Sequence, residues 1–265
     1  MPHFKKEHII ELANRIVIFA NDNLELINKL GIDINNEHDS TYVGMIIRQL
    51  SLNSDLSILI GNKKNKYLTS EHILLRCIID DYIHMIYITN QNNSEDIITN
   101  YNADAINKNY NKIKELAELN EEKLNGNYQF YPTYALLEET KEKMKNSPKR
   151  QQYFLDKDNF KFKTFKATGN LIRDLKDEDS YSHQLRRAYF IWRKYSDFVH
   201  YSNFTFEEES AIDPEKDETY AEFAEIISYS YFTILSCLKH FEKKYNLTVI
   251  DSKGLAEYYK NSGHK

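Results

Sequence analysis

Four side chains in the segment RKYSDFVH have the types and spacing for chemistry at a phosphate: Arg193, Ser196, Asp197 and His200. If the segment is helical, at about 100° per residue, the arginine, aspartate and histidine project within roughly 60° of one another. They then offer a cation, an orienting anion and a proton carrier on one face. A histidine can take the proton of a ribose 2′-hydroxyl while an arginine stabilises the charge on the phosphorane, and neither step requires a metal.

A second polar stripe crosses the most apolar segment of the chain, HILLRCIIDDYIHMIYIT. Arg76, Asp80, His84 and Tyr87 project within roughly 80° of one another on a helix. A buried, unpaired charge costs several kcal/mol, so Arg76 needs a partner, and Asp80 is the candidate one turn away. We favour a structural ion pair that fixes helix packing. The alternative is that the stripe forms one wall of a ligand pocket.

The segment from Arg193 to His200 resembles the Arg-x4–6-His element of the HEPN superfamily. The resemblance implies a helical and usually dimeric protein of a superfamily that includes metal-independent ribonucleases of toxin and antiphage systems. It also implies that Arg193 and His200 line an RNA cleft shared by two subunits. Lys194 departs from the family, which often has Asn, Asp or His at that position.

The stretch between residues 70 and 205 is also similar to an uncharacterised family of bacterial all-helical proteins. That family has an Arg-x3-acid element and a later Tyr-Ser-x3-His element, carried here by Arg76, Asp80, Tyr195, Ser196 and His200. The similarity implies no activity. It does predict that the two polar stripes meet between two packed helices.

An irregular, basic and aromatic insertion is predicted over residues 148–180, where helical periodicity is weakest. Between residues 141 and 166, nine basic residues against three acidic ones give a net charge of +6, interleaved with tyrosine and phenylalanine. Lys161 and Lys163 are therefore candidate RNA-binding residues, since cations neutralise phosphates and aromatic faces stack bases. We favour the alternative of a solvated lysine surface with its aromatic residues in the core. Residues 203–218 are predicted to be a solvated acidic loop.

Apolar residues at three- and four-residue spacing predict the helices that must position both stripes. The predicted segments lie at residues 9–27, 40–60, 70–89, 94–124, 133–146, 180–203, 220–245 and 255–260. We predict an all-α protein, a single helical bundle of about six to eight helices over residues 1–265. The alternation in NFKFKTFK allows at most one small hairpin.

Composition excludes several classes of function. The 7 glycines are too dispersed for a phosphate-binding loop, and Cys77 and Cys237 lie too far apart in sequence for a Cys-x-x-Cys site. The histidines form no zinc motif, so we expect no metal and no cofactor. A formal net charge of -5 argues against a surface that binds nucleic acid over its whole extent. No run approaches the roughly 18 to 20 apolar residues of a membrane span, and we expect a cytoplasmic protein.

The sequence therefore supports the hypothesis of a HEPN-like, metal-independent endoribonuclease or RNA-binding effector that acts as a homodimer. His200 would be the general base or acid and Arg193 the transition-state clamp, with Asp197 or Ser196 orienting them. One alternative is a non-catalytic helical module that binds a protein partner or a small ligand. Another is an enzyme that acts on a small molecule through Arg76 and Asp80.

Overall fold

A computed structural model describes residues 4–32, 36–62, 69–197 and 216–261. The described elements are helices apart from one two-stranded sheet, which confirms the all-α prediction. The chain divides into two compact units: the first unit is Met1–Gln91 with Thr168–Lys265, and the second unit is Asn92–Ala167. The sequence predicts one helical domain instead, because helical periodicity runs through both units and does not show which helices share a core.

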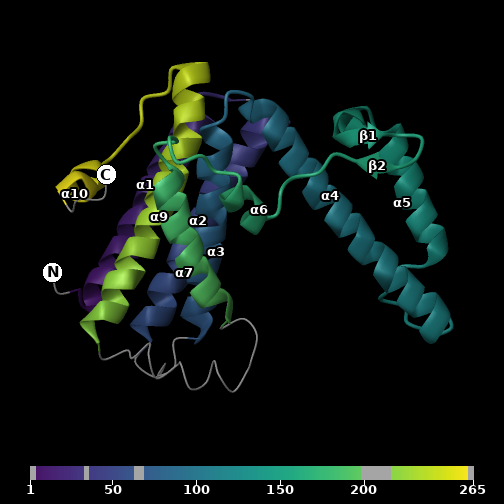
Figure 1. Ribbon diagram of the computed structural model, residues 1–265, viewed down its shortest axis with the longest axis horizontal. Coiled ribbons are helices and arrows are strands. Elements are labelled where there is room, and N and C mark those ends of the chain that lie inside the picture. The colour runs from purple at the N-terminus through teal and green to yellow at the C-terminus, as the bar shows by residue number, and fades with distance from the viewer. Residues whose placement is uncertain (1–3, 33–35, 63–68, 198–215, 262–265) are drawn as a thin grey trace. The chain divides into compact units, whose positions relative to one another are not determined.

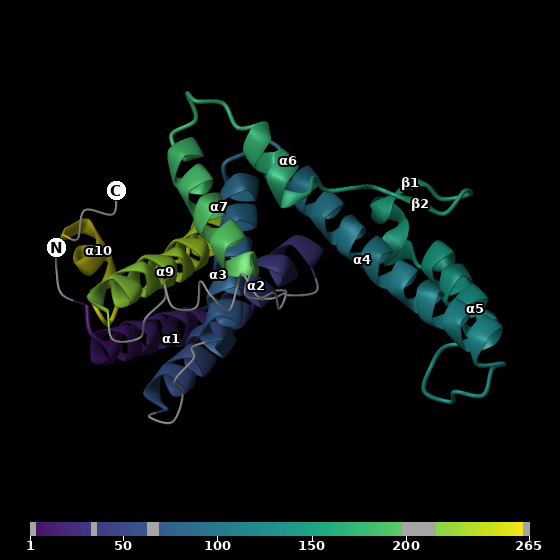
Figure 2. The same ribbon diagram turned by 60° about the horizontal axis from the view of Figure 1, so that its bottom comes forward.

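The first unit is a bundle of long helices (Figure 1). Its elements are α1 (Lys6–Lys29), α2 (Glu37–Gly61), α3 (Thr69–Thr89), α6 (Thr168–Arg173), α7 (Ser182–Asp197), α9 (Asp217–Tyr245) and α10 (Leu255–Asn261). α3 packs against α2, α6, α7 and α9, and Figures 1 and 2 both show it among these neighbours. This is the position expected of a helix with apolar residues on nearly every side.

A buried polar network joins α3 to α2 and α9. Oδ2 of Asp81, a residue that is 5% exposed, accepts hydrogen bonds from Arg48 Nε and Gln49 Nε2, both at 2.7 Å. Ser230 on α9 donates to Gln49 Oε1 and accepts from Asn53 Nδ2, both at 2.8 Å. Because each of these bonds crosses between two helices, the network fixes the register of α2, α3 and α9 relative to one another.

A second buried carboxylate fastens the start of α2 to the end of α9. The side chain of Asp39 is fully buried and accepts from His240 Nε2 at 2.6 Å, Lys244 Nζ at 2.8 Å and Tyr245 Oη at 2.5 Å. These donors hold the pKa of Asp39 below its usual value although burial opposes them. The cluster is saturated by its own donors, and we assign it to structure.

The helix boundaries follow local capping chemistry. Asn36 begins α2, because its side chain accepts from the backbone N–H groups of His38 and Asp39 at 3.0 and 3.4 Å. The helix therefore begins at Glu37, three residues before the start predicted from the sequence. At the same end of the bundle α9 stops at Asn246, which adopts the left-handed conformation with φ of 54°.

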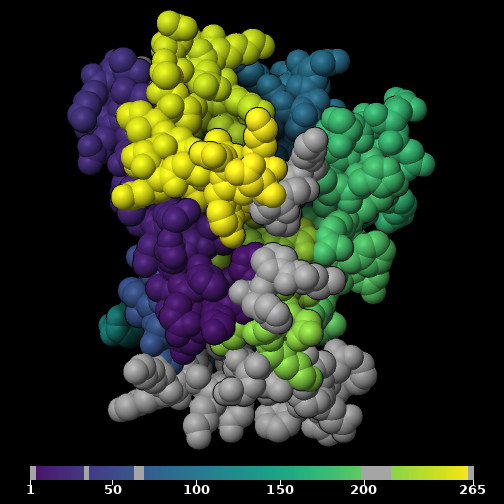
Figure 3. All heavy atoms as spheres, turned by 90° about the vertical axis from the view of Figure 1, so that its left-hand side faces the viewer, coloured from purple at the N-terminus to yellow at the C-terminus, as the bar shows by residue number. Residues whose placement is uncertain are grey.

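The C-terminal segment packs onto α1 and α9 beside the N-terminal helix in Figure 3. Asn23 on α1 donates to the Ile250 carbonyl at 2.8 Å and accepts from the Ile250 N–H at 2.9 Å. Tyr259 on α10 lies against Tyr231 on α9 with ring centroids 4.9 Å apart. These contacts give the chain after α9 a defined place on the bundle.

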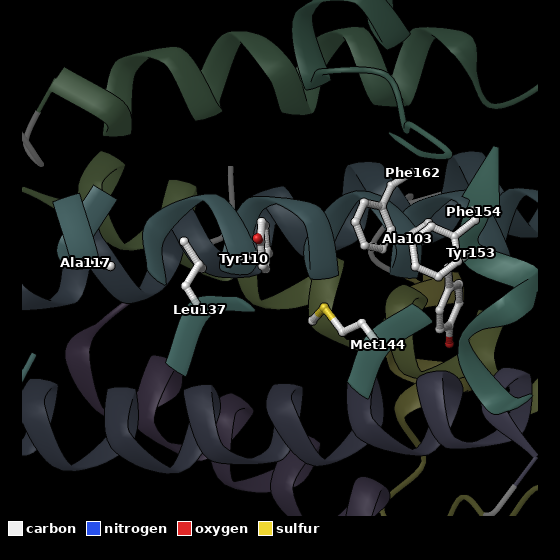
Figure 4. Close-up of a cluster of buried hydrophobic side chains, with 8 residues drawn as sticks. All are labelled: Ala103, Tyr110, Ala117, Leu137, Met144, Tyr153, Phe154 and Phe162. Atoms are coloured by element: carbon white, nitrogen blue, oxygen red, sulfur yellow. The ribbon is translucent and has the colours of Figure 1, made fainter. Parts of the chain in front are cut away.

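The second unit is a helical hairpin with a small core of its own. Its elements are α4 (Ser94–Glu118), the π-helix η1 (Leu119–Lys123), α5 (Tyr134–Asn146), the 3-10 helix η2 (Pro148–Tyr153), β1 (Phe154–Asp156) and β2 (Lys161–Phe162). The two strands pair antiparallel, with Phe154 opposite Phe162. The eight buried side chains of Figure 4 form the core: Ala103, Tyr110, Ala117, Leu137, Met144, Tyr153, Phe154 and Phe162.

Among the helices of the described ranges, none combines the length and the apolar character that crossing a bilayer requires.

We expect Asp81→Asn to change how stability depends on pH. Burial raises the pKa of Asp81 from 3.8 to about 6, so between these values the folded state keeps a proton that the unfolded state has released. The carboxyl thus contributes stability below about pH 4 that is lost as the pH rises through about 6. Relative to wild type, the free energy of unfolding of the variant should rise by up to about 3 kcal/mol from about pH 4 to about pH 7.

Denaturant unfolding of both proteins across this pH range measures the difference. Asp55→Asn, which replaces an exposed carboxyl on the same α2 that carries Arg48, is the matched control and should leave the pH profile unchanged. Parallel profiles for wild type and Asp81→Asn would contradict the prediction.

Candidate functional site

The packing of α7 on α3 brings the first polar stripe to the second. Arg76 Nε on α3 donates to Ser196 Oγ on α7 at 3.1 Å, and Ser196 Oγ donates to the Trp192 carbonyl at 2.7 Å. We call the polar groups along this contact the α3–α7 seam; they are Arg76, Asp80, His84, Thr168, Tyr189, Trp192 and Ser196. The pairing of the two stripes predicts that Arg76, Asp80, Arg193 and His200 meet; the structure brings Arg76 to Ser196 instead, Arg193 is exposed, and His200 lies outside the described residues.

The guanidinium of Arg76 is held by an aromatic stack. Its Cζ atom lies 4.8 Å from the ring centroid of Trp192, within the range of a cation–π interaction. Tyr189 stacks on Trp192, with ring centroids 5.6 Å apart and 14° between the ring planes. Stacking and the single bond through Nε fix the plane of the guanidinium while its two Nη groups donate to no described residue.

Arg76 forms no ion pair with Asp80 in the part of the chain that the structure describes, so the predicted intrahelical pair is wrong. The Arg76 side chain contacts Ser196 and Trp192 instead. The nearest partner of Asp80 is Thr168 at the start of α6, whose Oγ1 lies 3.5 Å from Oδ1. Thr168 Oγ1 also lies 3.1 Å from His84 Nε2. Arg76 and Asp80 lie one turn apart on α3, but each contacts a different set of neighbours.

Three cations of α7 differ from Arg76 on α3 because each has a carboxylate partner. Arg186 pairs with Asp177, Arg187 Nη2 with Glu225 at 2.6 Å, and Lys194 Nζ with Glu222 at 2.9 Å. Arg193 is exposed and, like Arg76, has no acidic partner within 4 Å among the described residues. Arg76 on α3 and Arg193 on the exposed side of α7 therefore have no counter-charge among the described residues.

Tyr195 belongs to the core rather than to the exposed side of the seam. Its side chain is fully buried, and its hydroxyl donates to Glu222 Oε1 on α9 at 2.7 Å. His72 packs edge-on against the Tyr195 ring with centroids 5.2 Å apart. The predicted binding role of Tyr195 thus gives way to a packing role, because one residue along a helix turns a side chain by about 100°.

The remaining predicted catalytic residues lie at the end of the described part of α7. Asp197 is exposed and is the last described residue of α7, and Ser196 is partly buried. His200 and the acidic loop over residues 203–218, except for its last three residues, lie outside the described residues. The role of His200 as general base or acid therefore stays a prediction.

Lys161 and Lys163 belong to the second unit. The aromatic residues around them serve its core: Tyr153, Phe154 and Phe162 are each less than a tenth exposed, and Phe160 packs against the same cluster. The idea that these rings stack RNA bases is therefore wrong, because the hairpin needs them to bury its own apolar surface. The lysine-rich charge of the segment remains at its surface.

Sequence reasoning missed the buried carboxylates Asp39 and Asp81 and the supporting role of Thr168. Asp81 differs from Asp80 by one position, and only the neighbours of α3 show which of the two faces inward. A polar pair, Arg48 and Gln49, inside the apolar pattern of α2 is the signal that could have indicated a buried partner. No three His, Cys, Asp or Glu side chains gather as a metal site within the described ranges.

No known protein family matches the sequence, and comparisons with curated proteins and with solved structures likewise find no match.

We expect His72→Leu to remove part of the acid sensitivity of the first unit. Burial, aided by the charge of Lys194, lowers the pKa of His72 from 6.5 to about 4, so the folded state keeps the imidazole neutral. The unfolded chain takes up a proton below about pH 6.5, and the stability that His72 contributes is lost as the pH falls toward about 4. Relative to wild type, the variant should gain up to about 3 kcal/mol over that range.

Unfolding midpoints in denaturant at a series of pH values test this. His183→Leu, an exposed histidine on α7, provides the comparison and should follow the wild-type profile. The prediction fails if the stability difference between wild type and His72→Leu is constant with pH.

Proposed function

We propose that the α3–α7 seam binds the phosphate groups of RNA and that the protein is a HEPN-like, metal-independent endoribonuclease. The observation that carries the proposal is the guanidinium of Arg76, which is stacked on Trp192, bonded once to Ser196 and left without a carboxylate among the described residues. The family resemblance of the segment from Arg193 to His200 supplies the chemistry.

An arginine in this state favours an anionic ligand. Removing a charge from water without a partner is unfavourable, and the aromatic stack offsets only part of that cost. The two Nη groups of Arg76 can donate a pair of parallel hydrogen bonds to one phosphate, which is the geometry that guanidinium provides and ammonium does not. Arg193 adds a second cation on the exposed side of the same α7. Together they support recognition of a phosphodiester rather than of a neutral ligand.

The proposed reaction is transfer within the RNA chain. His200 accepts the proton of a ribose 2′-hydroxyl, the 2′-oxygen attacks the adjacent phosphorus, and the bond from phosphorus to the 5′-oxygen breaks. Arg193 stabilises the charge on the phosphorane, a water molecule gives a proton to the leaving 5′-oxygen, and His200 returns its proton to the resulting hydroxide. The products are a 2′,3′-cyclic phosphate and a 5′-hydroxyl. Asp197 and Ser196 are positioning residues in this scheme.

One arrangement favours the alternative of a non-catalytic binding module. Beside Arg76, the hydroxyl of Thr168 lies between Asp80 and His84 at 3.5 and 3.1 Å, so the seam offers acceptors as well as donors within two helical turns. A compact ligand that carries both a phosphate and hydroxyl groups, such as a nucleotide, would use both. Binding without cleavage is the outcome that this alternative predicts.

Trp192 is the only tryptophan in the chain, so its fluorescence reports on the seam. We expect a short single-stranded RNA and, at higher concentration, inorganic phosphate to change its emission. Arg76→Lys should weaken RNA binding about tenfold or more, because lysine neither stacks on the indole in the same way nor donates two parallel bonds. Arg186→Lys is the matched control on α7, where the arginine already has a carboxylate partner, and it should bind as wild type does.

Cleavage is tested with labelled RNA in the presence of EDTA. Wild type should cleave, and His200→Ala and Arg193→Ala should each reduce the rate by about a hundredfold or more while keeping the wild-type Tm. RNA binding that persists without any cleavage by wild type would refute the catalytic part and support the binding module. Equal RNA affinity of wild type and Arg76→Lys would refute the role of the seam itself.

A further inference from the structure

The end of the second unit where α4 passes into α5 exposes an unusual concentration of large apolar side chains. They are Leu116, Leu119, Leu124, Tyr128, Phe130, Tyr134 and Leu136, each between 37% and 78% exposed. We call residues 115–139 the tip. Single exposed apolar residues are ordinary on a protein surface, but seven within about twenty positions form the kind of patch that marks an interaction site.

The tip is built to hold these side chains in place. Asn120 is 1% exposed, and its Nδ2 donates to the carbonyls of Tyr131 and Pro132 at 3.4 and 3.3 Å. Its Oδ1 accepts from the Tyr128 N–H at 3.1 Å, so one buried amide closes the loop at three points. The rings of Tyr128 and Phe130 lie 5.7 Å apart. A loop ordered in this way pays little further entropy on binding, which favours a defined partner over random contact.

Charge indicates what that partner is. The tip contains six glutamates and one lysine, a net charge of -5. Residues 141–166, which follow the tip along the chain, carry +6. Lys141 and Lys143 of this segment pair with Glu138 and Glu139 of the tip. The charge left for a second copy is therefore -3 on the tip and +4 on residues 141–166. Because the aromatic residues of that basic segment are in the core, its exposed surface is dominated by lysine, with Leu155 as an apolar side chain that is 63% exposed. One copy of the unit therefore presents the surface that is complementary to the tip of another.

We propose that the tip docks on residues 141–166 of a second copy of the chain, in an antiparallel arrangement about a two-fold axis. Each tip then meets the basic segment of the other copy, so the contact is made twice and the assembly closes as a dimer. Attraction between the tip and the basic segment selects the antiparallel arrangement, since parallel packing would place acidic tip on acidic tip. None of the seam residues belongs to this unit, and the interface is independent of the proposed activity.

Analytical ultracentrifugation of the full chain over a range of concentrations tests the proposal. We expect a monomer–dimer equilibrium that weakens as NaCl is added. Phe130→Ser should raise the dimer dissociation constant about tenfold or more. Phe190→Ser is the matched control: Phe190 lies on α7 and is 68% exposed, close to the 78% of Phe130, and its removal should leave association unchanged.

Charge reversal gives the decisive comparison. One variant carries Glu115→Lys, Glu118→Lys, Glu121→Lys and Glu122→Lys, which change the net charge of the tip from -5 to +3. The other carries Lys149→Glu, Lys157→Glu, Lys161→Glu and Lys166→Glu, which change that of residues 141–166 from +6 to -2. Each should be monomeric alone, while an equimolar mixture of the two variants should form a heterodimer of wild-type strength. That result follows because each reversed segment meets an opposite charge only in the mixture. A wild type that stays monomeric at the highest soluble concentration, open-ended polymers, or a mixture that fails to associate would each overturn the proposal.

Discussion

The near-complete burial of α3 is the constraint on which the first unit depends. A helix with apolar residues on almost every side must be covered all round, and α2, α6, α7 and α9 do this. Every polar side chain on α3 then needs a partner from a covering helix. Asp81 is satisfied by Arg48 and Gln49 from α2, and Asp80 meets Thr168 from α6. Arg76 is met from α7 by Ser196 and by the ring of Trp192.

Arg76 differs from these residues because the neighbours that cover it, Ser196 and Trp192, do not neutralise its charge. Asp81 lies next to a cation and Glu222 next to Lys194, so those buried or half-buried charges are matched within the protein. The stack on Trp192 orients the guanidinium and excludes water from one face, but it supplies no negative charge. This oriented guanidinium, with no counter-charge among the described residues, is the observation on which the proposed phosphate site rests.

The second unit shows how one set of residues can meet two demands. Its small core takes its apolar surface largely from aromatic residues, so Tyr153, Phe154 and Phe162 are buried. This removes the stacking surface that the sequence suggested and leaves charge as the main property of residues 141–166. In the tip, the hydrogen bonds of the buried Asn120 hold the loop that contains Phe130, and the side chain of Phe130 stays exposed. Opposite charge on the tip and on residues 141–166 follows from this division.

The sequence by itself determined the helical class and the positions of most helices, because apolar periodicity is a local property that survives in a single chain. α1 and α9 begin and end close to the predicted residues, α7 begins close to its predicted start, and the second strand of the small hairpin lies where NFKFKTFK alternates. Tertiary structure alone decided that two units form, that Asp81 rather than Asp80 is buried, and that Arg76 leaves its intrahelical neighbour for Trp192. Those choices depend on which distant helix covers each face, and one residue of rotation, about 100°, reverses them.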